Sequence, residues 1–156
     1  SSTVLHVTGD RTTTNSTYNI ANFTNAGTSK CIIRDSGNLE NTNNSYGAIS
    51  DEKLKQNIED ANSQWDDIKA VRFRKFKFKD MVEDGFKLGV VAQELEKVSP
   101  SLISEAIDRD TDGKDLGTTT KSVKYSILQM KGIVALQEAL NRIETLEAKV
   151  KELESK

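Results

Sequence analysis

The strongest pattern of apolar positions lies at the C-terminal end of the chain. Six apolar residues follow one another at alternating spacings of three and four: Leu136, Ala139, Ile143, Leu146, Val150 and Leu153. This spacing assigns them to alternating a and d positions of about three heptads, and Ile133 and Leu140 widen the stripe on one flank. The pattern predicts a helix that forms a coiled coil over about residues 128–154. A lone amphipathic helix packed on its own domain is the alternative.

The middle of the chain alternates between helical and extended patterns. Acidic residues and then apolar residues at helical spacing follow a serine, which predicts a helix over about residues 50–69. Residues 71–79 alternate apolar and basic side chains, as a strand does, and the Asp-Gly pair at 84–85 signals a hairpin that leads into a return strand over 86–91. Further along, we expect a short helix, a short strand and a polar loop, over residues 92–98, 102–103 and 108–120.

Residues 1–49 differ in composition from the remainder of the chain. They contain 23 Ser, Thr and Asn residues and six charged ones, whereas the other 40 charges fall in residues 50–156. Short apolar clusters alternate with glycines, which predicts strands at Val4–Val7, Tyr18–Ile20 and Cys31–Ile33 and turns at Gly9, Gly27 and Gly37. Such a segment has too little apolar surface to fold alone. We therefore expect residues 1–49 to be the end of an extended, oligomeric β-structure whose core is shared between chains, with a flexible linker as the alternative.

Charge and residue usage exclude several classes of protein. The 22 Lys and Arg residues against 24 Asp and Glu residues leave a net charge of −2, so there is no electrostatic case for binding nucleic acid or an anionic membrane. No apolar run approaches the ~18–20 residues of a membrane span. Cys31 and His6 are the only residues of their kinds, which excludes an internal disulfide and a cysteine-based zinc site and leaves little room for histidine-dependent catalysis. The opening residues, 1–3, suggest a fragment of something longer.

Two further patterns have a functional and a simpler interpretation. Residues 108–113 have acidic side chains and a glycine at the spacing that begins a calcium loop, but the twelfth position is Thr119 instead of Glu, so we expect a solvated loop. Residues 69–79 interleave six cations with phenylalanines, as some RNA-binding sheets do. The 21 acidic residues of the same half favour an amphipathic strand with its cations in water.

Ser50 and Lys55 form a candidate catalytic pair. A serine hydroxyl is a poor nucleophile until a base removes its proton, and lysine can be that base where burial keeps its amine neutral. A spacing of five does not align two side chains on one face of a regular helix, so Ser50 would have to precede the helix on an extended approach. A helix N-cap is the alternative role for Ser50.

Four segments resemble one known family when they are taken together. In chain order they are Ser50–Ile58, Gly89–Glu96, Val123–Tyr125 and Leu136–Glu138. They resemble the C-terminal intramolecular chaperone domains of bacteriophage tail fibres, tailspikes and endosialidases, which are the S74 self-cleaving peptidases. The resemblance implies an α+β fold for residues 50–156, which would form a small mixed helix/strand domain with a long C-terminal coiled-coil helix. A β-rich fibre segment over residues 1–49 would precede this domain. The whole chain would form an intertwined homotrimer.

The resemblance also implies the residues of the site. In that family the serine is both the nucleophile and the first residue after the cut, so the scissile bond would be Ile49–Ser50. Lys55 would be the base or proton shuttle, and Asp51 would help to position the site. Lys53 stands where the family pattern has Arg, and a lysine lacks the planar fork that binds a carboxylate at two points. We therefore expect a single-turnover, self-cleaving serine endopeptidase that needs no cofactor and no metal.

The implied partners and location follow from the same resemblance. We expect a homotrimer whose substrate is its own upstream fibre segment, with no nucleic acid and no membrane as partner. It would act in the host cytoplasm during phage assembly, leaving the fibre part in the virion tail and releasing the chaperone domain. A related family of self-cleaving, membrane-tethered transcription factors shares this domain, so the phage assignment depends on the composition of residues 1–49. The alternatives are a non-cleaving trimeric coiled-coil assembly module and, less favoured, an RNA-binding domain.

Overall fold

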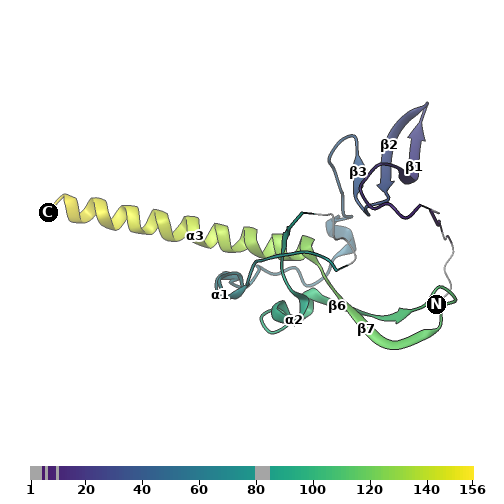
Figure 1. The fold of residues 1–156 in the computed structure, drawn as a ribbon. Helices are drawn as coiled ribbons and strands as arrows, with labels where there is room; N and C mark the ends of the chain where they lie inside the picture. The colour runs from purple at the N-terminus through teal and green to yellow at the C-terminus, as the bar shows by residue number, and fades with distance from the viewer. Residues whose placement is uncertain (1–4, 6, 10, 80–84) are drawn as a thin grey trace. The chain divides into compact units, whose positions relative to one another are not determined.

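The computed structural model describes residues 5, 7–9, 11–79 and 85–156 (Figure 1). The chain divides into two compact units: unit 1 comprises Ser1–Ile58 and Lys77–Gly85, and unit 2 comprises Glu59–Phe76 and Phe86–Lys156. Val4 and His6 of the first predicted strand, and Asp84 of the predicted hairpin turn, lie outside the described residues. The expected domain boundary between residues 49 and 50 stays a prediction.

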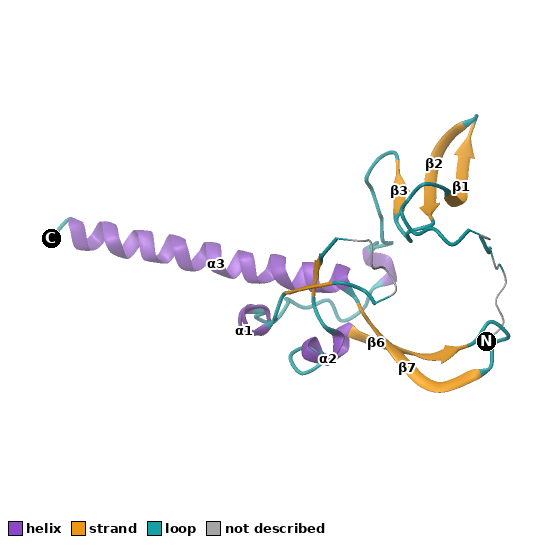
Figure 2. Ribbon diagram, viewed as in Figure 1, coloured by secondary structure: helices purple, strands orange, loops and turns teal. Residues whose placement is uncertain are grey.

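Unit 1 contains a three-stranded antiparallel sheet in the order β1-β2-β3 (Figure 2). The strands are β1 (Asn19–Asn25), β2 (Thr28–Arg34) and β3 (Leu39–Asn41). Gly27 at φ +75° and Gly37 at φ +83° occupy the left-handed region beside β2, so these two predicted turns are confirmed. Leu5 and Val7 lie in no strand. None of the residues in these three strands is buried, so the sheet has no core of its own in the single chain.

The predicted helix over residues 50–69 is wrong as one element. Within this range, all of which is described, unit 1 has a 3₁₀ turn, η1 (Glu52–Leu54), and unit 2 has the start of α1 (Trp65–Ala70). Residues 55–64 lie in neither a helix nor a strand. Asn57 has φ +52°, a left-handed conformation that a continuous right-handed helix excludes.

Two antiparallel pairs of strands form the β-structure of unit 2. The predicted hairpin is present as β4 (Arg74–Phe76) and β5 (Lys87–Gly89), each shorter than expected. The second pair is β6 (Ile103–Arg109) and β7 (Asp115–Val123), with Ile103 opposite Val123. The prediction of a polar loop over residues 108–120 is therefore wrong, because most of that segment pairs as a strand despite its lack of apolar alternation.

Four of the buried apolar side chains form one core cluster in unit 2. They are Val90, Leu95, Leu102 and Leu128, with Ile68, Val71, Ile103 and Val123 packed against them. Two short elements supply part of this core, namely α2 (Ala92–Leu95) and η2 (Pro100–Leu102), and the predicted helix at 92–98 is confirmed in shortened form. Unit 2 is a small mixed α+β domain with a C-terminal helix, as the sequence predicts.

The C-terminal helix, α3 (Tyr125–Glu154), begins at the core and continues beyond it (Figure 1). The large apolar residues of its a/d stripe are 50–69% exposed: Leu136, Ile143, Leu146, Val150 and Leu153. The single chain therefore leaves most of this stripe in water. Among the described residues, no helix is both long enough and apolar enough to cross a membrane.

Candidate active site

Ser50 and Lys55 lie in contact in unit 1. The Nζ atom of Lys55 donates a hydrogen bond to the Oγ atom of Ser50 over 2.7 Å. Both residues are exposed in the single chain, and Ile49, on the other side of the implied scissile bond, is 88% exposed. The structure therefore brings the two predicted chemical groups together beside an accessible peptide bond.

The backbone between the two residues explains how a spacing of five produces this contact. Asp51 is extended, with φ −68° and ψ 135°, and η1 then makes one tight turn. Lys55 is extended again, with φ −115° and ψ 156°, and its N–H donates to the carbonyl oxygen of Glu52 over 2.9 Å. Because a 3₁₀ turn has about three residues, the chain reverses within η1 and returns Lys55 to Ser50. Ser50 lies before the turn and next to the extended Asp51.

Asp51 shapes this turn through contacts with Lys53. Its carboxylate accepts a hydrogen bond from the backbone N–H of Lys53 over 3.0 Å, which makes Asp51 the N-cap of η1. The Nζ atom of Lys53 also lies 3.2 Å from this carboxylate. That ion pair is exposed and contributes little stability, so the cap is the more important of the two contacts. Asp51 therefore supports the geometry of the pair through the turn.

The acidic residues of the candidate calcium loop have structural roles. Asp110 accepts hydrogen bonds from the backbone N–H groups of Asp112 and Lys114, and Asp108 accepts one from Thr118, so both carboxylates stabilise the β6–β7 hairpin. In the described part of the chain, no group of three or more His, Cys, Asp or Glu residues is placed to hold a metal ion.

The basic segment of the chain is partly neutralised by one carboxylate. Arg74 donates two hydrogen bonds to Glu94 of α2, at 2.8 and 2.5 Å, and Arg72 lies 3.7 Å from the same group. These contacts, led by Arg74, hold the pKa of Glu94 below its usual value.

Glu138 is a structural residue that local pattern does not reveal. Its carboxylate accepts hydrogen bonds from Ser63 Oγ over 2.7 Å and from the backbone N–H of Gln64 over 2.8 Å, and so caps α1 from α3. These two bonds, first that of Ser63, hold the pKa of Glu138 below its usual value. The partners are 75 and 74 positions apart, so no spacing rule could pair them. In the sequence, Glu138 stands out through its place in the Leu136–Glu138 segment of the family resemblance.

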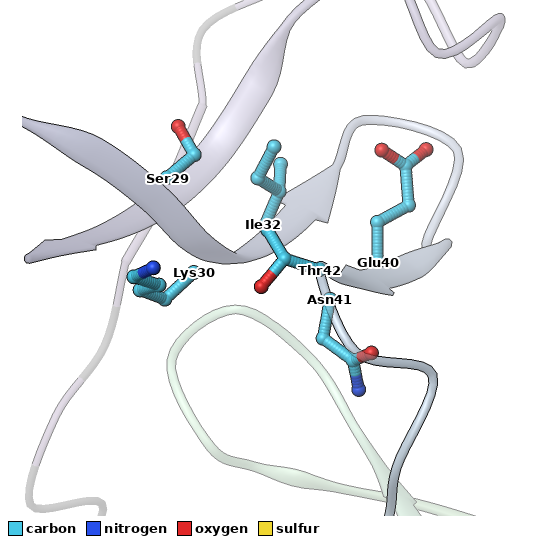
Figure 3. A pocket seen from close by; sticks show the side chains of 6 residues that line it. All are labelled: Ser29, Lys30, Ile32, Glu40, Asn41 and Thr42. Atoms are coloured by element: carbon cyan, nitrogen blue, oxygen red, sulfur yellow. The ribbon is translucent and has the colours of Figure 1, made fainter.

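A hollow of about 140 Å³ lies on the sheet of unit 1. It is lined by Ser29, Lys30, Ile32, Glu40, Asn41 and Thr42 (Figure 3). Lys30 and Glu40 lie on different sides of it, and Glu40 is bound to Arg34 over 2.7 Å. The side chains do not converge on a common point, so this hollow is a weaker candidate than the Ser50–Lys55 pair.

Comparisons with known proteins give one family match and several similar solved structures. Residues 50–104 match the family Peptidase S74, described as the chaperone of endosialidase. No curated protein matches the chain. One similar solved structure is described as a novel intramolecular chaperone, with 23% identity, a TM-score of 0.45, and coverage of 60% of this chain and 99% of that one.

A second similar structure is the carboxy-terminal domain of the bacteriophage T5 L-shaped tail fibre with its intramolecular chaperone domain. It has 14% identity, a TM-score of 0.46, and coverage of 77% of this chain and 41% of that one. The matched family segment begins at Ser50 itself. The part of this chain that is similar to the Peptidase S74 family, the chaperone of endosialidase, is therefore residues 50–104.

Proposed function

We propose that residues 50–156 are an intramolecular chaperone that trimerises, registers the fibre segment of residues 1–49, and then releases itself by cutting between Ile49 and Ser50. The observation that carries the proposal is the 2.7 Å contact between Lys55 Nζ and Ser50 Oγ. It is supported by the family match, which starts at Ser50.

The cleavage step uses this pair as nucleophile and base. The reactive form needs a neutral Lys55 amine that accepts the proton of the Ser50 hydroxyl, which reverses the direction of the hydrogen bond. The Ser50 oxygen then attacks the carbonyl carbon of Ile49, the C–N bond breaks, and the Ser50 nitrogen takes the proton from Lys55. Water hydrolyses the resulting ester, which leaves a carboxylate on Ile49 and restores the Ser50 hydroxyl.

Assembly of the trimer would supply the burial of Lys55 that the single chain lacks. An exposed lysine is well solvated, whereas burial disfavours the charged form and so favours the neutral amine that the base requires. Packing of three copies around the site would provide this burial. Cleavage would then follow trimer formation and act as a checkpoint on folding.

The chaperone role follows from the properties of the upstream segment. A sheet with no buried residue has weak register signals, and slipped pairing is a hazard for such strands. A trimeric C-terminal domain would hold three segments together, raise their effective concentration and make later pairing local. Once cut, the fibre would be kinetically trapped, because unfolded chains would lack the domain that registered them. We place these events in the host cytoplasm during phage assembly.

Intact mass under denaturing conditions tests the proposal. We expect the parent chain to yield fragments of 49 and 107 residues, and the Ser50→Ala chain to remain at 156 residues. Ser45→Ala is a matched control, since Ser45 is also exposed in unit 1, and it should cleave as the parent does. An uncleaved parent that still assembles would refute self-cleavage and leave the non-cleaving assembly module.

A further inference from the structure

An apolar groove lies between α1 and α3 in unit 2. This α1–α3 groove has a volume of about 440 Å³ and is lined by Trp65, Ile68 and Lys69 of α1 and by Gly132, Ala135 and Leu136 of α3. Trp65 and Ile68 are half-buried, whereas Leu136 is 59% exposed. The groove therefore joins the surface of α1 to the apolar stripe of α3.

The heptad positions show which side of α3 borders the groove. With Leu136 at a, Ala135 is a g position, and Ile133 and Leu140 are e positions. The groove thus lies on the g flank, and the two e residues, which are 49% and 51% exposed, lie on the other flank of the same helix. In a parallel, in-register coiled coil, each g residue faces the e residue five positions later in the neighbouring helix. Ala135 of one chain then faces Leu140 of a second copy.

The charges further along α3 favour this parallel arrangement. The next two g residues are Arg142 and Lys149, and the e residues five positions later are Glu147 and Glu154. Each pair joins opposite charges between copies when the helices are parallel and in register. An antiparallel pair would instead bring g flanks together and place these cations near one another. Charge complementarity therefore selects the same alignment that places Leu140 at the groove.

Arg142 can stack on Trp65 and also bind a carboxylate of a second copy. Its guanidinium lies over the Trp65 ring, 4.1 Å from the ring centroid. Stacking uses the face of the guanidinium and leaves its N–H edge available for a carboxylate. The same arginine can therefore hold Trp65 at the rim of the groove and bind Glu147 of a second copy.

We propose that the α1–α3 groove receives Leu140 of a second copy of this chain, so that α1 and Trp65 are part of the assembly interface. The inference rests on the proposed self-assembly and names the surface that it uses beyond the a/d stripe. It assigns Leu140 an apolar partner on another chain.

Trp65 is the only tryptophan of the chain and reports directly on the groove. In the uncleaved 156-residue Ser50→Ala chain, we expect Trp65 emission to shift to shorter wavelength as concentration rises and copies assemble. Leu140→Ala should abolish that shift and weaken assembly by roughly tenfold or more, the effect of one leucine side chain left unburied. Asn141→Ala, one position away on the outer face of the helix, should leave both unchanged.

Crosslinking gives a second readout. In a Cys31→Ser background, we expect Ala135→Cys combined with Leu140→Cys to give covalent oligomers with a short thiol-specific reagent. Asn141→Cys combined with Ala148→Cys, both at outward f positions, should give none.

Two results would overturn the groove assignment alone. One is an assembled chain in which Leu140→Ala leaves Trp65 emission unaffected. The other is an assembled chain whose double-cysteine variant at positions 135 and 140 forms no covalent oligomer. A monomer at every concentration would overturn it together with the proposed trimer, while the mass of the parent decides self-cleavage separately.

Discussion

The hydroxyl group of Tyr125 lies directly against the backbone of Gly89. A Cβ atom added at Gly89 would be 2.6 Å from the Tyr125 hydroxyl oxygen, closer than van der Waals contact allows. The same hydroxyl oxygen accepts a hydrogen bond from the N–H of Val90 over 3.2 Å. The first residue of α3 is thereby fixed to the end of β5, and two segments of the family resemblance are in contact.

This contact predicts that Gly89→Ala destabilises unit 2. We expect a loss of about 1–3 kcal/mol in the free energy of unfolding, the usual effect of overpacking, measured by urea denaturation of the Ser50→Ala chain. Adding Tyr125→Phe should restore part of that loss, because it removes the clashing oxygen. Gly85→Ala is the control, since a Cβ there meets no atom within 4 Å. An equal effect of the two glycine changes would contradict the packing argument.

The cap on η1 predicts that Asp51 affects cleavage through the turn. Asp51→Asn retains a side-chain oxygen for the Lys53 N–H and should cleave at close to the parent rate. Asp51→Ala removes the cap, worth about 0.5–2 kcal/mol, and should slow cleavage roughly two- to thirty-fold. The rates are measured by intact mass over time after refolding. Equal slowing by both changes would show that the Asp51 charge, and not its capping oxygen, matters.

The contacts of the Asp67 carboxylate predict a specific dependence of stability on pH. Its carboxylate lies 2.7 Å from Lys131 Nζ and accepts a hydrogen bond from Ser99 Oγ over 2.8 Å, and these contacts, first that of Lys131, hold its pKa below the ordinary value of 3.8. A carboxyl with a lowered folded pKa stabilises the fold above its unfolded pKa and loses that contribution as pH falls through the folded pKa. Asp67→Asn should therefore be less stable than the parent at neutral pH, and the difference should shrink below about pH 4.

Thermal unfolding of both chains from neutral to acidic pH measures this difference. Comparing parent with variant at each pH isolates the contribution of Asp67. A difference that stays constant down to the most acidic pH at which the chain is folded would contradict the role of the Asp67 charge.

The exposed stripe of α3 predicts a link between assembly and cleavage. Ile143 and Leu146 are 50% and 59% exposed in the single chain, so Ile143→Asp with Leu146→Asp should abolish the trimer while unit 2 still folds. Cleavage should slow with the loss of the trimer. Sedimentation measures the oligomeric state, and intact mass measures cleavage. Asn141→Asp with Ala148→Asp adds the same charge at outward positions and should change neither. Cleavage at full rate in the first variant would refute the checkpoint.

The sequence alone determined the features that depend on near neighbours. The heptad spacing predicted α3, glycines predicted the turns at Gly27 and Gly37, and the alternation of apolar and basic residues predicted the β4–β5 pair. Each signal lies within a few residues, because helix faces, turn dihedrals and strand faces repeat over such distances. Residue types make Ser50 and Lys55 a candidate pair, and the family resemblance implies roles for both and for Asp51.

Only the tertiary structure decided how those residues are arranged and what they contact. The chain is extended again at Lys55 and left-handed at Asn57, so no continuous helix follows Ser50, and a single 3₁₀ turn brings Lys55 to Ser50. The strand β7 carries no apolar alternation, and its pairing with β6 gives it an extended structure that pattern could not reveal. Glu138 reaches Ser63 across 75 positions. These contacts depend on which distant segments pack together, and local residue spacing carries no information on that choice.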